Sequence, residues 1–381
     1  MIIIPDIPKR FTGHFLDYYK NTMQHFGFFS REEIDNNKGK LLMLDIDFGR
    51  YCSLRCPGCF RKSNAVDDLD SGDLSYAELL SVIDEARELG LQSVKICGAG
   101  ESTQNVQFLQ FLHDLNERDV GVAVFTKGQV LGSDEETIKY YGEFGIDSAL
   151  DLCKRMYLLK TSFMLSYQSF DTEKQDSLVG GVEGHSLIRD KALENLAAAG
   201  FNTSQPTRLA LELGPIFNET IEDVFDLYVY ARERNIYTIT NLLMVSGKQI
   251  DHDFLARYDC SDKSKLDLFL KIYSWNVDHG IQTLQQIREE GISCMPGIHP
   301  CNQVAVGLYI TANGNVVSCP GFTYVEGNVR TQSIREIWEK SVNRHEKAGT
   351  FNCRCPPKDG ITIPLNLYQE VLDQLERKYG D

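Results

Sequence analysis

Short apolar runs alternate with amphipathic stretches from Leu41 to about residue 250. The apolar runs predict buried strands at 41–48, 92–97, 120–126, 161–168, 207–213 and 236–244, and the amphipathic stretches predict helices at 76–90, 105–118, 136–145, 187–199 and 220–234. Strand-then-helix units in a row imply a parallel sheet with right-handed crossovers. Six units rather than eight indicate an α/β fold, a partial (β/α)6 barrel.

The chain on either side of this barrel, residues 41–250, has a different pattern. Residues 1–40 mix aromatic and charged positions and read as an irregular or helical N-terminal extension. A helical stretch near 264–290 makes residues 251–290 a helical connector. Residues 291–381 predict a hairpin at 304–319 and a helix at 332–345, which together indicate a small C-terminal α+β domain.

The composition is that of an ordinary soluble protein, with 42% hydrophobic and 24% charged residues. No apolar run reaches the roughly 18–20 residues that span a bilayer, and the opening MIIIPDIPKR lacks the features of a secretory signal. We therefore expect a cytoplasmic protein without a membrane partner. The net charge of −15 repels phosphate backbones, which makes a nucleic-acid partner unlikely.

Eleven cysteines need an explanation in such a chain, because cytosolic thiols stay reduced. Three of them, Cys52, Cys56 and Cys59, directly follow the first predicted strand in the run GRYCSLRCPGCFRK. Thiolates this close belong to a loop around one metal centre, at the strand end where active sites of such folds lie. A [4Fe-4S] cluster takes four cysteines, so three leave one iron open to an outside ligand.

This loop resembles that of the radical S-adenosylmethionine superfamily, whose members bind the cofactor on the open iron within a partial, TIM-like (β/α)6 barrel. The resemblance covers about residues 40–250. It implies that Gly98, Ala99, Gly100 and Glu101, which follow the second strand, contact the methionine amine. Glycines permit close approach to a ligand, and a carboxylate pairs well with an ammonium group.

The resemblance also assigns the ribose hydroxyls to the end of the fourth strand, where this chain offers Ser166 and Gln168. Gln168 replaces the usual acidic residue. A second departure is Gly58, where an aromatic residue often precedes the third cysteine. The adenine-stacking role then either passes to Phe60 or is lost.

A second group of cysteines lies in the C-terminal domain. Cys301 and Cys319 frame the predicted hairpin as C-x12-G-x4-C, and Cys353 and Cys355 complete a set of four. The arrangement resembles the auxiliary domains called SPASM and Twitch, and it implies one auxiliary [4Fe-4S] cluster. Because the closing pair is C-x-C rather than C-x2-C, Cys294 is an alternative to Cys353 or Cys355 as a ligand.

The resemblance implies an enzyme that cleaves S-adenosylmethionine reductively and abstracts a substrate hydrogen with the 5′-deoxyadenosyl radical. A flavodoxin- or ferredoxin-type protein is the expected electron donor. Only about 40 residues precede the first strand, whereas many peptide-modifying members carry a recognition domain of 80 to 90 residues. This favours a small metabolite, such as a sugar or cyclitol, over a peptide or protein substrate.

Two readings from other classes stay open: an iron–sulfur electron-transfer protein, which needs no vacant iron, and a zinc-binding module. Lys127, Glu212 and Asn241 lie at predicted strand ends and are candidates to face a substrate. For each of them a structural polar contact is the more ordinary explanation, so no catalytic acid or base is assigned. Cys97 ends an apolar strand and reads as a buried small residue.

Overall fold

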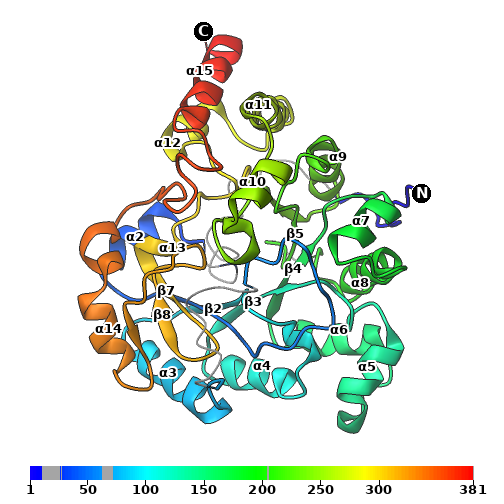
Figure 1. The fold of residues 1–381 in the computed structure, drawn as a ribbon, viewed down its shortest axis with the longest axis vertical. Coiled ribbons are helices and arrows are strands. Elements are labelled where there is room, and N and C mark those ends of the chain that lie inside the picture. Colours follow the sequence, from blue (N-terminus) through cyan, green and yellow to red (C-terminus); the bar gives the residue numbers. More distant parts are fainter. Residues whose placement is uncertain (11–25, 27, 62–71, 204–205, 381) are drawn as a thin grey trace.

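The computed structural model describes residues 1–10, 26, 28–61, 72–203 and 206–380. Its centre is a sheet whose first six strands run parallel and pair in chain order (Figure 1). These strands are β1 (Met43–Ile46), β2 (Ser93–Ile96), β3 (Gly121–Thr126), β4 (Thr161–Ser166), β5 (Leu209–Glu212) and β6 (Tyr237–Ile239). All six lie where the apolar runs predict them, in shorter form.

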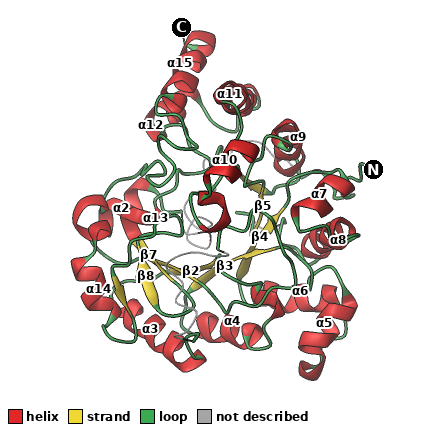
Figure 2. Cartoon of the chain, in the orientation of Figure 1, coloured by secondary structure: helices red, strands yellow, loops and turns green. Residues whose placement is uncertain are grey.

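Helices surround this sheet on its outer side (Figures 1 and 2). They are α3 (Tyr76–Glu88), α4 (Phe108–Glu117), α5 (Asp134–Tyr141), α6 (Ala149–Leu158), α7 (Thr172–Leu178), α8 (His185–Ala198) and α9 (Ile221–Arg232). Local sequence starts and orients them. Ser75 and Glu78 form a capping box at the start of α3, and α4 buries Phe108, Phe111 and Leu115 on one face.

The C-terminal strands extend the same sheet. β7 (Gly307–Ile310) runs parallel to β1, so that Met43 faces Ser93 on one side and Gly307 on the other. β8 (Asn315–Val317) and β9 (Gly327–Asn328) continue the sheet antiparallel. The predicted hairpin is thus present from Gly307 onward and lies against the first barrel strand, whereas residues 304–306 at its expected start belong to a short helix. The expected fold class, a parallel α/β core with a small C-terminal part, is confirmed.

Further helices precede β1 or follow β6 in the sequence. They are α2 (Arg31–Asn36), α10 (His252–Tyr258), α11 (Asp262–Asp278), α12 (Leu284–Glu290), α13 (Gln303–Val306), α14 (Ile334–Lys340) and α15 (Leu367–Tyr379). The sequence patterns did not yield α6, α7 or α15. Yet α6 has Ser148 as its N-cap and buries Leu152, Cys153 and Met156 at helical spacing, so its signal was present.

None of the helices in the described part of the chain has the length and apolar character needed to cross a membrane.

Candidate active site

Nine of the eleven cysteines line one cavity of about 290 Å³. Each of the six barrel strands contributes to its wall at or just beyond its C-terminal end, as Cys52, Gly98, Lys127, Ser166, Glu212 and Asn241 show. The other two cysteines, Cys153 and Cys260, are buried elsewhere. All eleven are free thiols. The structure therefore brings both predicted cysteine groups to a single chamber.

The loop Cys52–Cys59 is held against the turn that follows β2. Ser53 and Gln104 exchange two hydrogen bonds, of 3.0 and 2.8 Å, and the Glu101 N–H donates to the Tyr51 carbonyl at 2.7 Å. Gly100 makes this approach possible, since at φ +80° a Cβ would lie 2.8 Å from the Tyr51 oxygen. The three thiols are thus fixed beside the Gly98–Glu101 turn.

Burial and the neighbouring Glu101 raise the pKa of Cys52 to about 11. A positively charged metal favours the thiolate that burial disfavours, so binding of iron here is coupled to release of a proton. Three half-buried thiols on one loop facing a cavity fit an iron–sulfur cluster with one iron left free of protein ligands.

Glu101 is buried, and its carboxylate is already oriented by the chain. Oε1 accepts from the Thr126 hydroxyl at 2.8 Å and from the Thr103 hydroxyl at 2.7 Å, and Oε2 accepts from the Lys127 N–H at 2.9 Å. Each oxygen accepts from several directions, so Oε2 keeps capacity for a ligand on the cavity side. Glu101, Gly98, Ala99 and Gly100 all line the cavity, as a methionine-binding turn requires.

Asp47, which the sequence patterns did not single out, joins three parts of the site. Its carboxylate accepts from the Ala99 N–H at 2.6 Å, the Ala312 N–H at 3.0 Å and the Arg61 guanidinium at 2.8 Å, and also from the Tyr309 hydroxyl. These partners belong to the turn after β2, the end of β7 and the chain beyond Cys59. Asp47 therefore fixes the first cysteine loop relative to the C-terminal hairpin.

Gly58, the departure in the cysteine loop, is explained by the packing around it. A Cβ at this position would lie 2.9 Å from the ring of Phe217 and 3.2 Å from that of Phe254. A larger side chain before the third cysteine would therefore require these two rings to move. Phe60 lines the cavity and is the residue of this loop that remains available for stacking.

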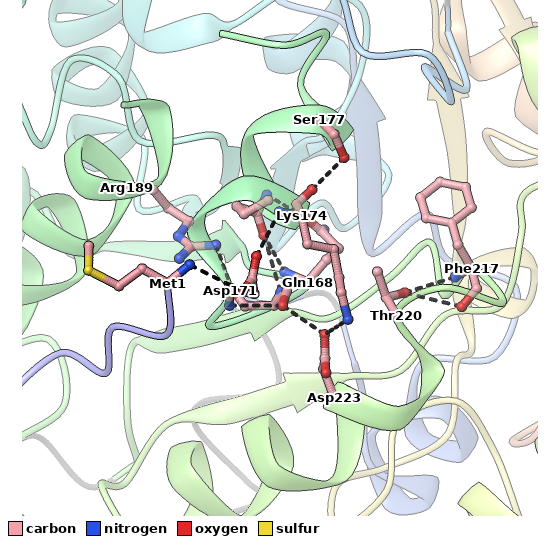
Figure 3. Close-up of polar contacts among 11 residues, drawn as sticks. Met1, Gln168, Asp171, Lys174, Ser177, Arg189, Phe217, Thr220 and Asp223 are labelled. Atoms are coloured by element: carbon pink, nitrogen blue, oxygen red, sulfur yellow. Dashed lines mark hydrogen bonds and ion pairs between the residues drawn. The ribbon is translucent and has the colours of Figure 1, made fainter. Parts of the chain in front are cut away.

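Ser166 and Gln168 differ in placement. Ser166 lines the cavity and accepts a hydrogen bond from Lys127 Nζ at 2.7 Å. Gln168 lies outside the described cavity wall; its Nε2 donates to the Gly214 carbonyl at 2.8 Å, and its Oε1 accepts from Gln175. Figure 3 shows it within a polar network at the start of α7. Gln168 thus connects strand ends, and its Nε2 also donates to the Ser166 hydroxyl at 2.8 Å.

Five C-terminal cysteines, here called the auxiliary cysteines, form one group: Cys294, Cys301, Cys319, Cys353 and Cys355. Burial is the main cause that raises the pKa of Cys294, Cys319, Cys353 and Cys355, and the charge of neighbouring auxiliary cysteines raises it further. The Cys353 N–H donates to the Cys301 carbonyl at 3.3 Å. Five cysteines that line one cavity can supply four cluster ligands, and Cys294 is one of the five.

A polar wall closes the cavity between the barrel and the C-terminal tail. Lys358 Nζ donates to Asn241 Oδ1 at 3.2 Å, and Asn241 Nδ2 donates to Glu212 Oε2 at 3.4 Å. Glu212 Oε1 accepts from the Gly214 N–H at 2.9 Å. Glu212 and Asn241 were candidates from the sequence, whereas nothing in the sequence pointed to Lys358.

Burial raises the pKa of Glu212 to about 7, although Lys358, Gly214 and Asn241 oppose the shift. Since the folded pKa lies above the unfolded value of 4.5, this glutamate stabilises the fold least at high pH. We expect the wild type to lose about 3 kcal/mol of unfolding free energy relative to Glu212→Gln as pH rises from about 4.5 to about 7. Urea unfolding of the metal-free reduced proteins at several pH values measures it.

Glu88→Gln is the control for this prediction, because the Glu88 side chain is 73% exposed. It makes the same chemical change on the surface of the protein. If the difference for Glu212→Gln does not change with pH, burial does not raise the pKa of Glu212.

Residues 301–356 match the SPASM family, described as an iron–sulfur cluster-binding domain. The match contains Cys301, Cys319, Cys353 and Cys355 and begins after Cys294. The predicted auxiliary iron–sulfur domain is confirmed. We call residues 301–356 the SPASM segment. No curated protein sequence matches the chain at a significant level.

Solved structures share the fold of most of the chain. Streptococcus suis SuiB bound to the precursor peptide SuiA aligns with a TM-score of 0.53 and 16% identity, over 82% of this chain and 68% of SuiB. SuiB bound to S-adenosylmethionine aligns with a TM-score of 0.52 and 15% identity, over 80% and 67%. The sequence resemblance to a barrel with an auxiliary SPASM segment is therefore confirmed at the level of the fold.

A third structure, BtrN in complex with AdoMet and 2-DOIA, covers 85% of this chain and 92% of its own, with 11% identity. Its TM-score of 0.38 is too low for an inference.

Proposed function

We propose that this chain is a radical S-adenosylmethionine enzyme with one auxiliary iron–sulfur cluster. The observation that carries the proposal is the shared cavity, in which the cysteine loop, the Gly98–Glu101 turn and the auxiliary cysteines face one another. In this proposal Cys52, Cys56 and Cys59 hold a [4Fe-4S] cluster whose open iron binds the cofactor. When bound, cluster and cofactor together supply a 5′-deoxyadenosyl radical that abstracts hydrogen from a substrate.

The residues of the chain bind and orient in this scheme. Glu101 accepts hydrogen bonds from the methionine ammonium group. Thr126 and Lys127 hold its carboxylate in place for this contact. Ser166, fixed by Lys127, contacts the ribose. Four of the auxiliary cysteines hold the second cluster. About half of the residues that line the cavity are buried, Glu101, Ser166 and Glu212 among them, which limits the access of water to a reactive radical.

The wall formed by Glu212, Asn241 and Lys358 supports a small polar metabolite, such as a sugar, cyclitol or other biosynthetic intermediate. Glu212 offers hydrogen-bond acceptors and Lys358 offers donors within one enclosed chamber. The reaction is then an oxidation or a rearrangement of this metabolite.

A peptide or protein substrate is the second candidate. SuiB, which shares the fold, has been seen with a precursor peptide. The neighbouring genes separate the two candidates, since a precursor-peptide gene favours the second and a cluster of sugar-biosynthesis genes the first.

The test of the proposal is anaerobic purification and reconstitution, followed by mixing with a reductant and S-adenosylmethionine. We expect a broad absorption band at about 400 nm, and 5′-deoxyadenosine as a product. A flavodoxin- or ferredoxin-type protein should replace the chemical reductant. A colourless protein would favour zinc, and a coloured protein that forms no 5′-deoxyadenosine would favour an electron carrier.

A further inference from the structure

Lys358 extends from the auxiliary cysteines to the barrel. Its backbone N–H donates to the Cys355 carbonyl at 2.8 Å, within the turn that follows this cysteine. Its Nζ donates to Asn241, just beyond the end of β6. The residue is 2% exposed and lines the cavity. A buried ammonium group is therefore fixed between the two parts of the chamber.

Lys358 makes no direct ion pair with a carboxylate in the described part of the chain, and Glu212 acts on it from a greater distance. Among the described residues no carboxylate oxygen lies within 4.0 Å of its Nζ, and its hydrogen-bond acceptor is a neutral amide. Lys95 in the same cavity wall differs, because Asp45 lies 3.2 Å from its Nζ. A buried cation without a directly paired anion is costly, so a negatively charged group bound beside Lys358 would stabilise it.

The thiols around Lys358 indicate which negatively charged group would bind beside it. The charges that act most strongly on it are those of Cys355 and Cys294, followed by Glu212 and Cys301. Three of these four are auxiliary cysteines. A cluster held by four thiolates carries net negative charge, which grows by one on reduction.

We propose that Lys358 is the counter-cation of the auxiliary cluster and raises its reduction potential. This inference rests on the proposed function. A fixed positive charge in a dry wall stabilises the more negative, reduced cluster more than the oxidised one. Lys358 thereby makes the auxiliary cluster a better electron acceptor, on the side of the cavity where Asn241 and Glu212 face a substrate.

The experiment compares Lys358→Met, Lys358→Arg and the wild type in the full chain, by titrating the auxiliary cluster with EPR detection at controlled potentials. A Cys52→Ala, Cys56→Ala, Cys59→Ala background leaves this cluster as the single signal. Lys378→Met, an exposed lysine, is the matched control. We expect Lys358→Met to shift the equilibrium about tenfold toward the oxidised cluster, which is about 59 mV for one electron, and Lys358→Arg to stay near the wild type.

An unchanged potential in a Lys358→Met protein with full iron content would overturn the assignment. Should Lys358→Met fail to assemble the cluster, Lys358→Gln takes its place in the titration. Assembly in Lys358→Arg but in neither neutral variant would also support the counter-cation role. Failure of the wild type to form any auxiliary cluster would instead remove the proposed function itself.

Discussion

Replacement of Cys56 by alanine is expected to abolish formation of 5′-deoxyadenosine. Cys56 is the middle residue of the loop that faces the Gly98–Glu101 turn, and with it lost the loop retains two thiols for the first cluster. The auxiliary cysteines should still bind iron, so the variant should keep part of its visible absorption. Chromatography of the reaction products together with iron analysis measures both effects.

Cys319→Ala is expected to impair product formation rather than cleavage of the cofactor. This cysteine follows β8 and belongs to the auxiliary group, so we expect some cofactor cleavage to persist while substrate product is lost. Cys153→Ala is the matched control, because Cys153 is fully buried in α6 away from the cavity. Equal and complete loss of cleavage in folded Cys56→Ala and Cys319→Ala proteins would contradict the division between the two cysteine groups.

Local patterns were enough to predict the barrel strands and both cysteine groups. Each strand is a short, mainly apolar run that can be recognised in its own stretch of sequence. The spacing of Cys52, Cys56 and Cys59 likewise predicts a loop without information from the rest of the chain. The turn Gly98–Glu101 could be found because it directly follows such a run. The residues that make up each of these features are close in sequence, so a local pattern is enough to predict them.

Contacts between distant segments left no such signal. The pairing of β7 with β1 joins residues more than 260 positions apart, and apolar alternation predicts a hairpin but not its neighbour. Lys358 and Asn241, whose side chains meet, are separated by 117 positions. The ribose contact of Gln168 stays a prediction, and the hydrogen bonds of its amide with Gly214 and Gln175 could be found only in the structure. Such roles depend on tertiary packing.

Asp47 shows how such packing couples the two cysteine groups, and Asp47→Ala is expected to lower the free energy of unfolding by about 3–5 kcal/mol. The substitution removes the buried ion pair of 2.8 Å with the Arg61 guanidinium and the acceptor of the N–H groups of Ala99 and Ala312. Gly98 packs so closely on this carboxylate that a Cβ there would lie 1.4 Å from Oδ1. The site around the turn should therefore loosen together with the fold.

Urea unfolding of the metal-free reduced proteins measures the loss, with Asp84→Ala as the control. Asp84 also pairs with an arginine, Arg118, at 2.8 Å, but its side chain is 48% exposed, so its removal should cost at most about 1 kcal/mol. If Asp47→Ala loses no more than Asp84→Ala, the buried carboxylate does not hold the cysteine loop and the SPASM segment together. A large loss accompanied by weaker S-adenosylmethionine binding in reconstituted protein would show that one carboxylate positions the turn and the hairpin at once.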